Sequence, residues 1–212
     1  MISTMQIERI EASKHKKGRI LVFLEDGNCL KATEQELLDF GLRAGDQVDE
    51  EVLLRLQSAA SGSEAKAAAA NLIGRRAMSR ADLTHKLRDK GVSSAEADYA
   101  AEWLEAIGAL NDGDYAAALV RHCAQMGYGP ARWREELHRH GVNRELWDEA
   151  MEAAPPIEEL TATYLAGRLH GQVPDQRERK RTADALARRG FSWGDIKSAI
   201  ARLGEAEEDD PV

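Results

Sequence analysis

The chain has 212 residues with 29 basic and 37 acidic side chains, a formal net charge of −8, and it is 43% hydrophobic but only 5% aromatic. A charged share of 31% beside a normal apolar share is typical of a soluble globular protein. No apolar run approaches the roughly 20 residues that cross a bilayer, and two cysteines make no disulfide framework. The net charge argues against a protein that coats DNA by bulk electrostatics. The first residues show no basic stretch followed by an apolar one, so no secretory signal is indicated and we expect a cytoplasmic protein.

The charge is unevenly distributed along the chain. Residues 155–204 hold nine basic and six acidic side chains, a net of +3, whereas residues 205–212 hold five acidic and no basic ones, a net of −5. This last segment has almost no apolar content, so we expect a disordered acidic tail. The net charge therefore does not exclude a protein with one basic end.

The first third of the chain begins with a small β unit. Residues 5–12, 19–25 and 28–32 have strand character and are separated by a polar loop and by Asp26-Gly27. Asp-Gly is a preferred pair for a type I′ hairpin turn, in which both residues need positive φ. The sequence thus predicts a three-stranded antiparallel meander.

Helices are expected from residue 33 onward. Thr33 and Glu36 form the pattern of a capping box, and Gly41 marks the end of the short helix that follows. Asp49 is expected to cap a further helix. Ser61-Gly62-Ser63 is expected to break it or to act as a short linker.

The remainder of the chain contains an internal repeat. Residues 79–92, 129–142 and 177–191 each place a leucine four positions before a glycine, followed by valine or phenylalanine, and the glycines are 50 and 49 residues apart. The apolar residues form a helix stripe, and the glycine ends the helix with positive φ. The repeat-core and turn residues are Leu83, Leu87, Gly91, Trp133, Leu137, Gly141, Leu186 and Gly190.

A second helix after each glycine also repeats, with N-caps at Ser93, Asn143 and Ser192. We therefore predict a mainly α protein of three tandem three-helix repeats that form an elongated curved array, preceded by the three-stranded β unit. The expected divisions are an N-terminal extension at 1–60, repeats at 64–110, 111–155 and 156–204, and the tail at 205–212.

At two stretches the chain resembles the RecX family, the regulators of the RecA recombinase. The first, 72–92, contains Arg75-Arg76, the Ser79 cap and Lys90-Gly91-Val92. The second, 110–142, contains Leu110, Asp112, Tyr115, Ala116, Arg121, Gly127, Gly129, Leu137 and Gly141. The resemblance covers about 64–204, and the N-terminal strands look like the extension of some members.

The resemblance implies a modulator of DNA repair and recombination. Family members bind in the groove of the filament that RecA forms on single-stranded DNA, and they usually inhibit its ATPase and strand exchange. It implies that the chain is not an enzyme. We further expect no cofactor, no association with a membrane and a monomeric protein. Strongly basic members bind DNA on their own, whereas this chain is acidic. Direct nucleic-acid binding by a helical repeat module is the alternative function.

Basic side chains are the candidate contacts with recombinase or DNA. On a helix, Arg177, Lys180, Arg181 and Arg188 share one side, which fits either phosphate contact or a solvated face. The candidates are Arg75, Arg76, Arg80, Lys86, Lys90, Arg121, Arg132, Arg177, Lys180, Arg181, Arg188 and Arg189.

No catalytic or metal-binding constellation is apparent. Gly127 and Gly129 lack the ending of a phosphate loop, and His138 and His140 lie on different helix faces. Asp112 and Asp114 are expected to cap a helix start. Trp133 and Trp147 sit at core positions, whereas Trp193 is expected to be exposed.

Overall fold

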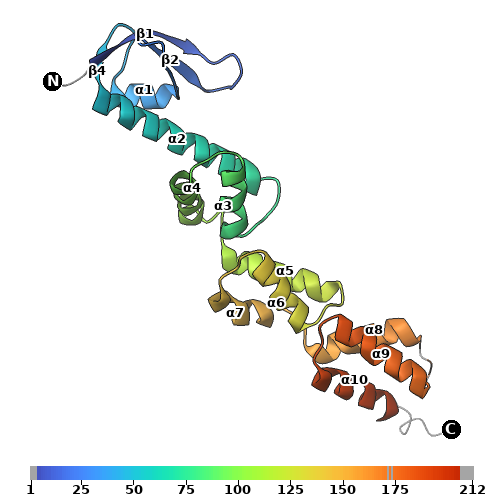
Figure 1. Ribbon diagram of the computed structural model, residues 1–212. Coiled ribbons are helices and arrows are strands. Elements are labelled where there is room, and N and C mark those ends of the chain that lie inside the picture. Colours follow the sequence, from blue (N-terminus) through green and yellow to red (C-terminus); the bar gives the residue numbers. More distant parts are fainter. Residues whose placement is uncertain (1–3, 171, 173, 206–212) are drawn as a thin grey trace. The chain divides into compact units, whose positions relative to one another are not determined.

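The computed structural model describes residues 4–170, 172 and 174–205. A small antiparallel sheet comes first and helices follow (Figure 1). The elements are β1 (Thr4–Ala12), β2 (Ile20–Leu24), β3 (Cys29–Ala32), α1 (Glu34–Phe40), β4 (Gln47–Asp49), α2 (Glu50–Ile73), α3 (Arg80–Asp89), α4 (Ser94–Ala106), α5 (Asp112–Gln125), α6 (Pro130–Arg139), the 3₁₀ turn η1 (Arg144–Leu146), α7 (Trp147–Glu152), α8 (Ile157–Leu169), α9 (Gln176–Arg188) and α10 (Trp193–Glu205). Except for Glu205, the tail expected to be disordered lies outside the described residues.

These elements form two compact units. The first contains the described residues up to 75 together with 84–107, and the second contains 76–83 and the described residues from 108 onward. The boundary runs through α3, whose first turn belongs to the second unit.

The sheet has four strands in the order β3-β2-β1-β4, so the prediction of a three-stranded unit was one strand short. The extra strand, β4, pairs antiparallel with the beginning of β1, where Met5 lies opposite Val48. Only three residues form this strand, too few to show a period-two pattern in the sequence.

The predicted hairpin between β2 and β3 is present, but its turn is not of type I′. Gly27 has φ +85°, and Asp26 is not among the residues with positive φ. The amide of Gly27 donates to the carbonyl of Leu24 at 3.0 Å, and the amide of Leu24 donates to the carbonyl of Asn28 at 2.9 Å. This is the three-residue loop in which a turn is followed by one left-handed glycine.

One face of the sheet packs on α1 and α2. The capping box of Thr33 and Glu36 is present, and Gly41 ends α1 with φ +66°, as predicted. The core between these elements contains Ile7, Val22, Leu24, Ala32, Leu37, Val48, Leu53, Leu56 and Ala60. Since a small sheet is marginal alone, burial against α2 stabilises it.

Helix α2 runs without interruption from Glu50 to Ile73, so the expected break at Ser61-Gly62-Ser63 was wrong. Both serines bond within the helix, because their hydroxyls donate to the carbonyls of Gln57 and Ala60. Gly62 is buried, and a Cβ there would lie 3.2 Å from the ring of Tyr99 on α4. The glycine therefore serves the close approach of two helices and not a turn.

The repeat produces the same helix ending three times. Gly91, Gly141 and Gly190 have φ of +86°, +64° and +90°. The residue after each glycine donates its amide to the carbonyl of the leucine five positions earlier, at 3.1, 3.0 and 3.3 Å. This is the Schellman motif, in which an apolar residue beyond the glycine closes over the helix end. The spacing of leucine and glycine in the sequence thus encodes the turn.

Each turn leads into a further helix of its three-helix unit. Ser93 and Glu96 form a reciprocal cap, and so do Ser192 and Asp195. The equivalent residue in the middle unit, Asn143, caps η1 before α7.

Candidate interaction surfaces

The first and second repeats meet at a close backbone contact within the second compact unit. The hydroxyl of Ser79, just before α3, donates to the carbonyl oxygen of His140 in the turn after α6. A Cβ at Gly141 would lie only 2.5 Å from the Cβ of Ala81. A glycine is therefore needed here for contact as well as for its φ.

The second and third repeats meet in the same way. The amide of Gly129 donates to the carbonyl of Arg189 at 2.8 Å, and the amide of Ala131 donates to that of Gly190 at 3.0 Å. A Cβ at Gly190 would lie 2.7 Å from the amide nitrogen of Arg132. In the alignment of the repeats, Ser79 corresponds to Gly129 and His140 corresponds to Arg189. Equivalent residues are therefore in contact at both junctions, so the junction recurs together with the sequence repeat.

Polar side chains surround the first junction. Asp112 accepts from the amide of Arg80 at 2.7 Å, and a carboxylate oxygen of Asp82 lies 2.7 Å from Nδ1 of His140. Asn111, not Asp112, caps α5. The ring of Tyr115 meets that of His140 edge-on at 5.8 Å, and burial, then the charge of Asp82, raises the pKa of the Tyr115 hydroxyl. His140 thus has partners within the chain for its carbonyl, its Nδ1 and its ring.

Two of the candidate contact residues, Arg132 and Arg189, are half-buried and bond to other groups of the chain. Arg189 donates to the carbonyl of Met126 at 3.1 Å, and its guanidinium lies 5.0 Å from the ring centre of Tyr164. Arg132 pairs with Glu135 and Glu136 at 2.7 and 3.2 Å. Both guanidinium groups thus have partners within the chain.

The basic face of α9 is more open. Arg177, Lys180, Arg181 and Arg188 are all exposed. Of these, Arg181 has a 3.7 Å contact with Glu178, which also accepts a 2.9 Å hydrogen bond from Arg168. The i, i+3 and i+4 spacing of these residues in the sequence predicted one shared side of a helix, and that side of α9 is exposed.

The remaining candidate contact residues are divided between the two compact units. Arg75, Lys86 and Lys90 belong to the first compact unit, while Arg76, Arg80 and Arg121 belong to the second. Arg80 and Lys86 are half-buried, and the other four are exposed.

The tryptophans divide as their positions in the repeat indicated. Trp133 is 2% exposed and donates to the carbonyl of Tyr128 at 2.7 Å. Trp147 donates to the carbonyl of Val142 at 3.0 Å. Trp193 is 68% exposed at the start of α10.

The polar loop predicted between the first two strands, residues 14–18, is also a basic segment that was not among the candidate contacts. This loop between β1 and β2 reads Lys-His-Lys-Lys-Gly, and Arg19 follows it. Lys16 forms an ion pair with Glu64, and Arg19 donates to the hydroxyl of Ser63 at 2.9 Å, both on α2. The run of cations was the signal that could have identified it.

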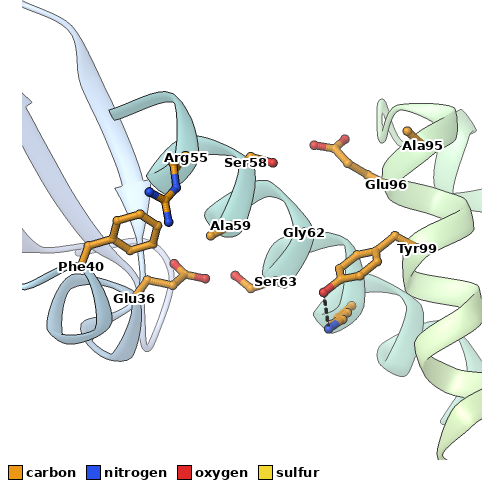
Figure 2. Close-up of a pocket in the computed structure, with 11 residues that line it drawn as sticks. Glu36, Phe40, Arg55, Ser58, Ala59, Gly62, Ser63, Ala95, Glu96 and Tyr99 are labelled. Carbon is orange, nitrogen blue, oxygen red and sulfur yellow. Dashed lines mark hydrogen bonds between the residues drawn. The ribbon is translucent and has the colours of Figure 1, made fainter. Parts of the chain in front are cut away.

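An open cleft of about 680 Å³ adjoins this contact, also within the first unit. Figure 2 shows Glu36 and Phe40 of α1 on one side, Glu96 and Tyr99 of α4 on the other, and α2 between them. The cleft is lined by Glu36, Phe40, Arg55, Ser58, Ala59, Gly62, Ser63, Lys66, Ala95, Glu96 and Tyr99.

The part of the chain that the structure describes offers neither a metal site nor a membrane-spanning helix. No group of three or more His, Cys, Asp or Glu side chains there is arranged to hold a metal ion. No helix among the same residues combines the length and apolar character needed to cross a membrane.

Comparison with known families identifies the helical units. Residues 65–104, 111–151 and 161–200 match the models of the first, second and third three-helix domains of RecX. A regulatory protein RecX from Stenotrophomonas maltophilia (strain R551-3) is 37% identical over 133 residues, which cover 62% of this chain and 82% of that protein. The chain belongs to the RecX family. A RecX protein from Halorhodospira halophila is 34% identical over 159 residues, or 74% of this chain and 99% of that one.

Solved RecX structures share the fold. One, described as regulatory protein RecX, has a TM-score of 0.68 at 24% identity and covers 93% of this chain and 99% of its own. RecX from Lactobacillus salivarius has a TM-score of 0.60 at 21% identity and covers 69% and 99%.

Proposed function

We propose that this RecX chain binds the filament that a RecA-type recombinase forms on single-stranded DNA, and that it lowers the filament's ATPase and strand-exchange activity. The observation that carries the proposal is the succession of three RecX three-helix domains in one chain. The curated relatives are named regulatory proteins, which is not an enzyme class. We therefore infer a cytoplasmic regulator of DNA repair and recombination that acts as a monomer, without catalysis or a cofactor of its own.

The exposed side of α9 is the contact surface that we favour. Arg177, Lys180 and Arg188 are exposed there and can neutralise phosphates or acidic side chains of the filament. Arg132 and Arg189, in contrast, bond within the chain. The contact thus involves the third three-helix domain more than the junctions between domains.

The test is the ATPase rate and sedimentation of recombinase filaments on single-stranded DNA. We expect stoichiometric amounts of the chain to co-sediment with filaments and to lower the ATPase rate. Lys180→Glu should weaken both effects about five- to tenfold if Lys180 meets one phosphate. Arg43→Glu, the same charge change on an exposed residue of the first unit, is the control. An unchanged ATPase rate together with no co-sedimentation would refute the proposal.

The same open face of α9 also supports the alternative function, direct binding of naked nucleic acid. That function requires strongly salt-dependent affinity for DNA without recombinase. Removal of the acidic segment 205–212 should then tighten the binding, because it removes the five negative charges that begin at the last residue of α10, Glu205. Weak affinity that responds to neither change excludes this alternative.

A further inference from the structure

The loop between β1 and β2 is a strongly basic surface fixed on α2. Lys16 and Arg19 anchor it at Glu64 and Ser63, while Lys14 and Lys17 are exposed. Lys16, and more weakly Arg19 and Lys31, lower the pKa of the Glu64 carboxyl against the opposing effect of its partial burial. Several cations thus gather around one carboxylate, which leaves a local positive excess.

The open cleft begins where this loop is anchored, because Ser63 both accepts from Arg19 and lines the cleft. An aromatic ring stands on each side with a cation from α2 beside it. The guanidinium of Arg55 lies 5.7 Å from the ring centre of Phe40, and the ammonium of Lys66 lies 4.3 Å from that of Tyr99. Arg55 and Lys66 are eleven residues apart, or about 16 Å along a helix.

Cations beside partly accessible aromatic rings in one groove form the combination that binds single-stranded nucleic acid, because phosphates need neutralising and unpaired bases stack. Tyr99 is 50% exposed, whereas Phe40 is half-buried and also packs on the core of the sheet and α2. A duplex hides its base faces and cannot stack in this way.

Two carboxylates on the rims disfavour anions of any kind, whether peptide carboxylates or phosphates, beside the rings. Glu36 and Glu96 bind the backbone amides of Thr33 and Ser93 at their own helix starts, and their charges repel other anions. They can still accept from the amino groups of bases. Phosphates are therefore favoured on the side of the loop and bases on the side of the rings.

We propose that the first compact unit holds a single strand of nucleic acid, with phosphates on the loop of residues 14–19 and bases against Phe40 and Tyr99. This site is separate from α9, and it requires no recombinase. Its failure would leave the proposed action on filaments untouched.

The first experiment measures binding of the full chain to a fluorescent single strand of about 15 nucleotides, within the range of single-strand sites, by anisotropy at several salt concentrations. Lys17→Glu is compared with Arg43→Glu, since both residues are exposed lysine or arginine side chains of the same unit. We expect Lys17→Glu to weaken binding about five- to tenfold and to reduce the salt slope by about 0.7. Arg43→Glu should match the unaltered chain.

The second experiment tests stacking at Tyr99. Tyr99→Leu should weaken single-strand binding at least about fivefold without changing the salt slope, whereas Tyr99→Phe, which keeps the ring, should retain the affinity. Thermal unfolding of both variants by circular dichroism verifies that α4 still packs on α2. A photoactivatable thymine analogue in the strand should crosslink to the loop or to the cleft.

Three results would overturn the proposal. One is equal binding by Lys17→Glu and Arg43→Glu, which would assign all affinity to other basic surfaces such as α9. Another is equal binding by folded Tyr99→Leu and Tyr99→Phe. The third is polyglutamate or a duplex of the same sequence competing as well as the single strand, which would indicate a partner recognised by charge alone.

Discussion

The hydroxyl of Ser79 donates to the carbonyl oxygen of His140, which lies 61 residues further along the chain. Ser79 is wholly buried, and the same hydroxyl accepts from the amide of Asp82 at 3.0 Å. One side chain therefore caps the start of α3 and also joins the first repeat to the second.

Ser79→Ala should consequently lower stability more than the loss of an ordinary cap. Removing a cap costs about 1 kcal/mol, and leaving the carbonyl of half-buried His140 without its donor adds about 1 kcal/mol. Urea unfolding followed by circular dichroism measures the sum. Ser94→Ala, at an exposed position in the first turn of α4, is the control and should be nearly neutral. Equal unfolding midpoints for the two variants would contradict the junction.

The three turn glycines provide an internally controlled series. Alanine at Gly91, Gly141 or Gly190 must adopt positive φ, at a cost of about 1 kcal/mol. At Gly91 the added Cβ meets nothing within 4 Å, but at Gly141 and Gly190 it meets atoms at 2.5 and 2.7 Å. We expect these two variants to lose a further 1–3 kcal/mol or so from overpacking.

Thermal unfolding of the three purified variants checks this order. Gly91→Ala should have the smallest decrease in Tm, and the other two should have larger decreases. If the Tm of all three variants decreases equally, glycine is needed only for its positive φ, and the close contacts at the junctions do not contribute to stability.

Arg188 and Arg189 are neighbours with opposite expected roles. Arg189→Ala removes a charged hydrogen bond to Met126 and the contact with Tyr164, which together contribute about 1.5–3 kcal/mol. Arg188 is exposed, and its replacement by alanine should change stability by less than about 0.5 kcal/mol.

Urea unfolding separates the two variants, and the recombinase ATPase assay separates them again. On the proposed function, Arg188→Ala should be stable but a weaker inhibitor. An Arg189→Ala chain with unchanged stability would show that this arginine is available to a partner after all.

This pair illustrates how far the sequence alone predicts the structure. Local signals were reliable: leucine four residues before glycine predicted each helix ending, and Ser93 with Glu96 predicted a cap. Residues far apart in the chain determined the rest. Ser61-Gly62-Ser63 resembles a break until α4 packs on it. Arg189 resembles its exposed neighbour until the second repeat supplies Met126 as its partner.

The two cysteines should differ sharply in reactivity. Cys29 is exposed, whereas Cys123 is 4% exposed. Burial, and secondarily the charge of Glu136, raises the pKa of the Cys123 thiol. Because only the thiolate attacks a disulfide reagent, a raised pKa means that less of Cys123 is reactive at a given pH.

With Ellman's reagent near pH 8 we expect one thiol to react rapidly in the native chain and the second only with denaturant. Raising the pH should accelerate the slow thiol only above the ordinary range for cysteine. Cys29→Ser should abolish the fast phase, and a fast phase that survived this substitution would show that α5 and α6 do not bury Cys123.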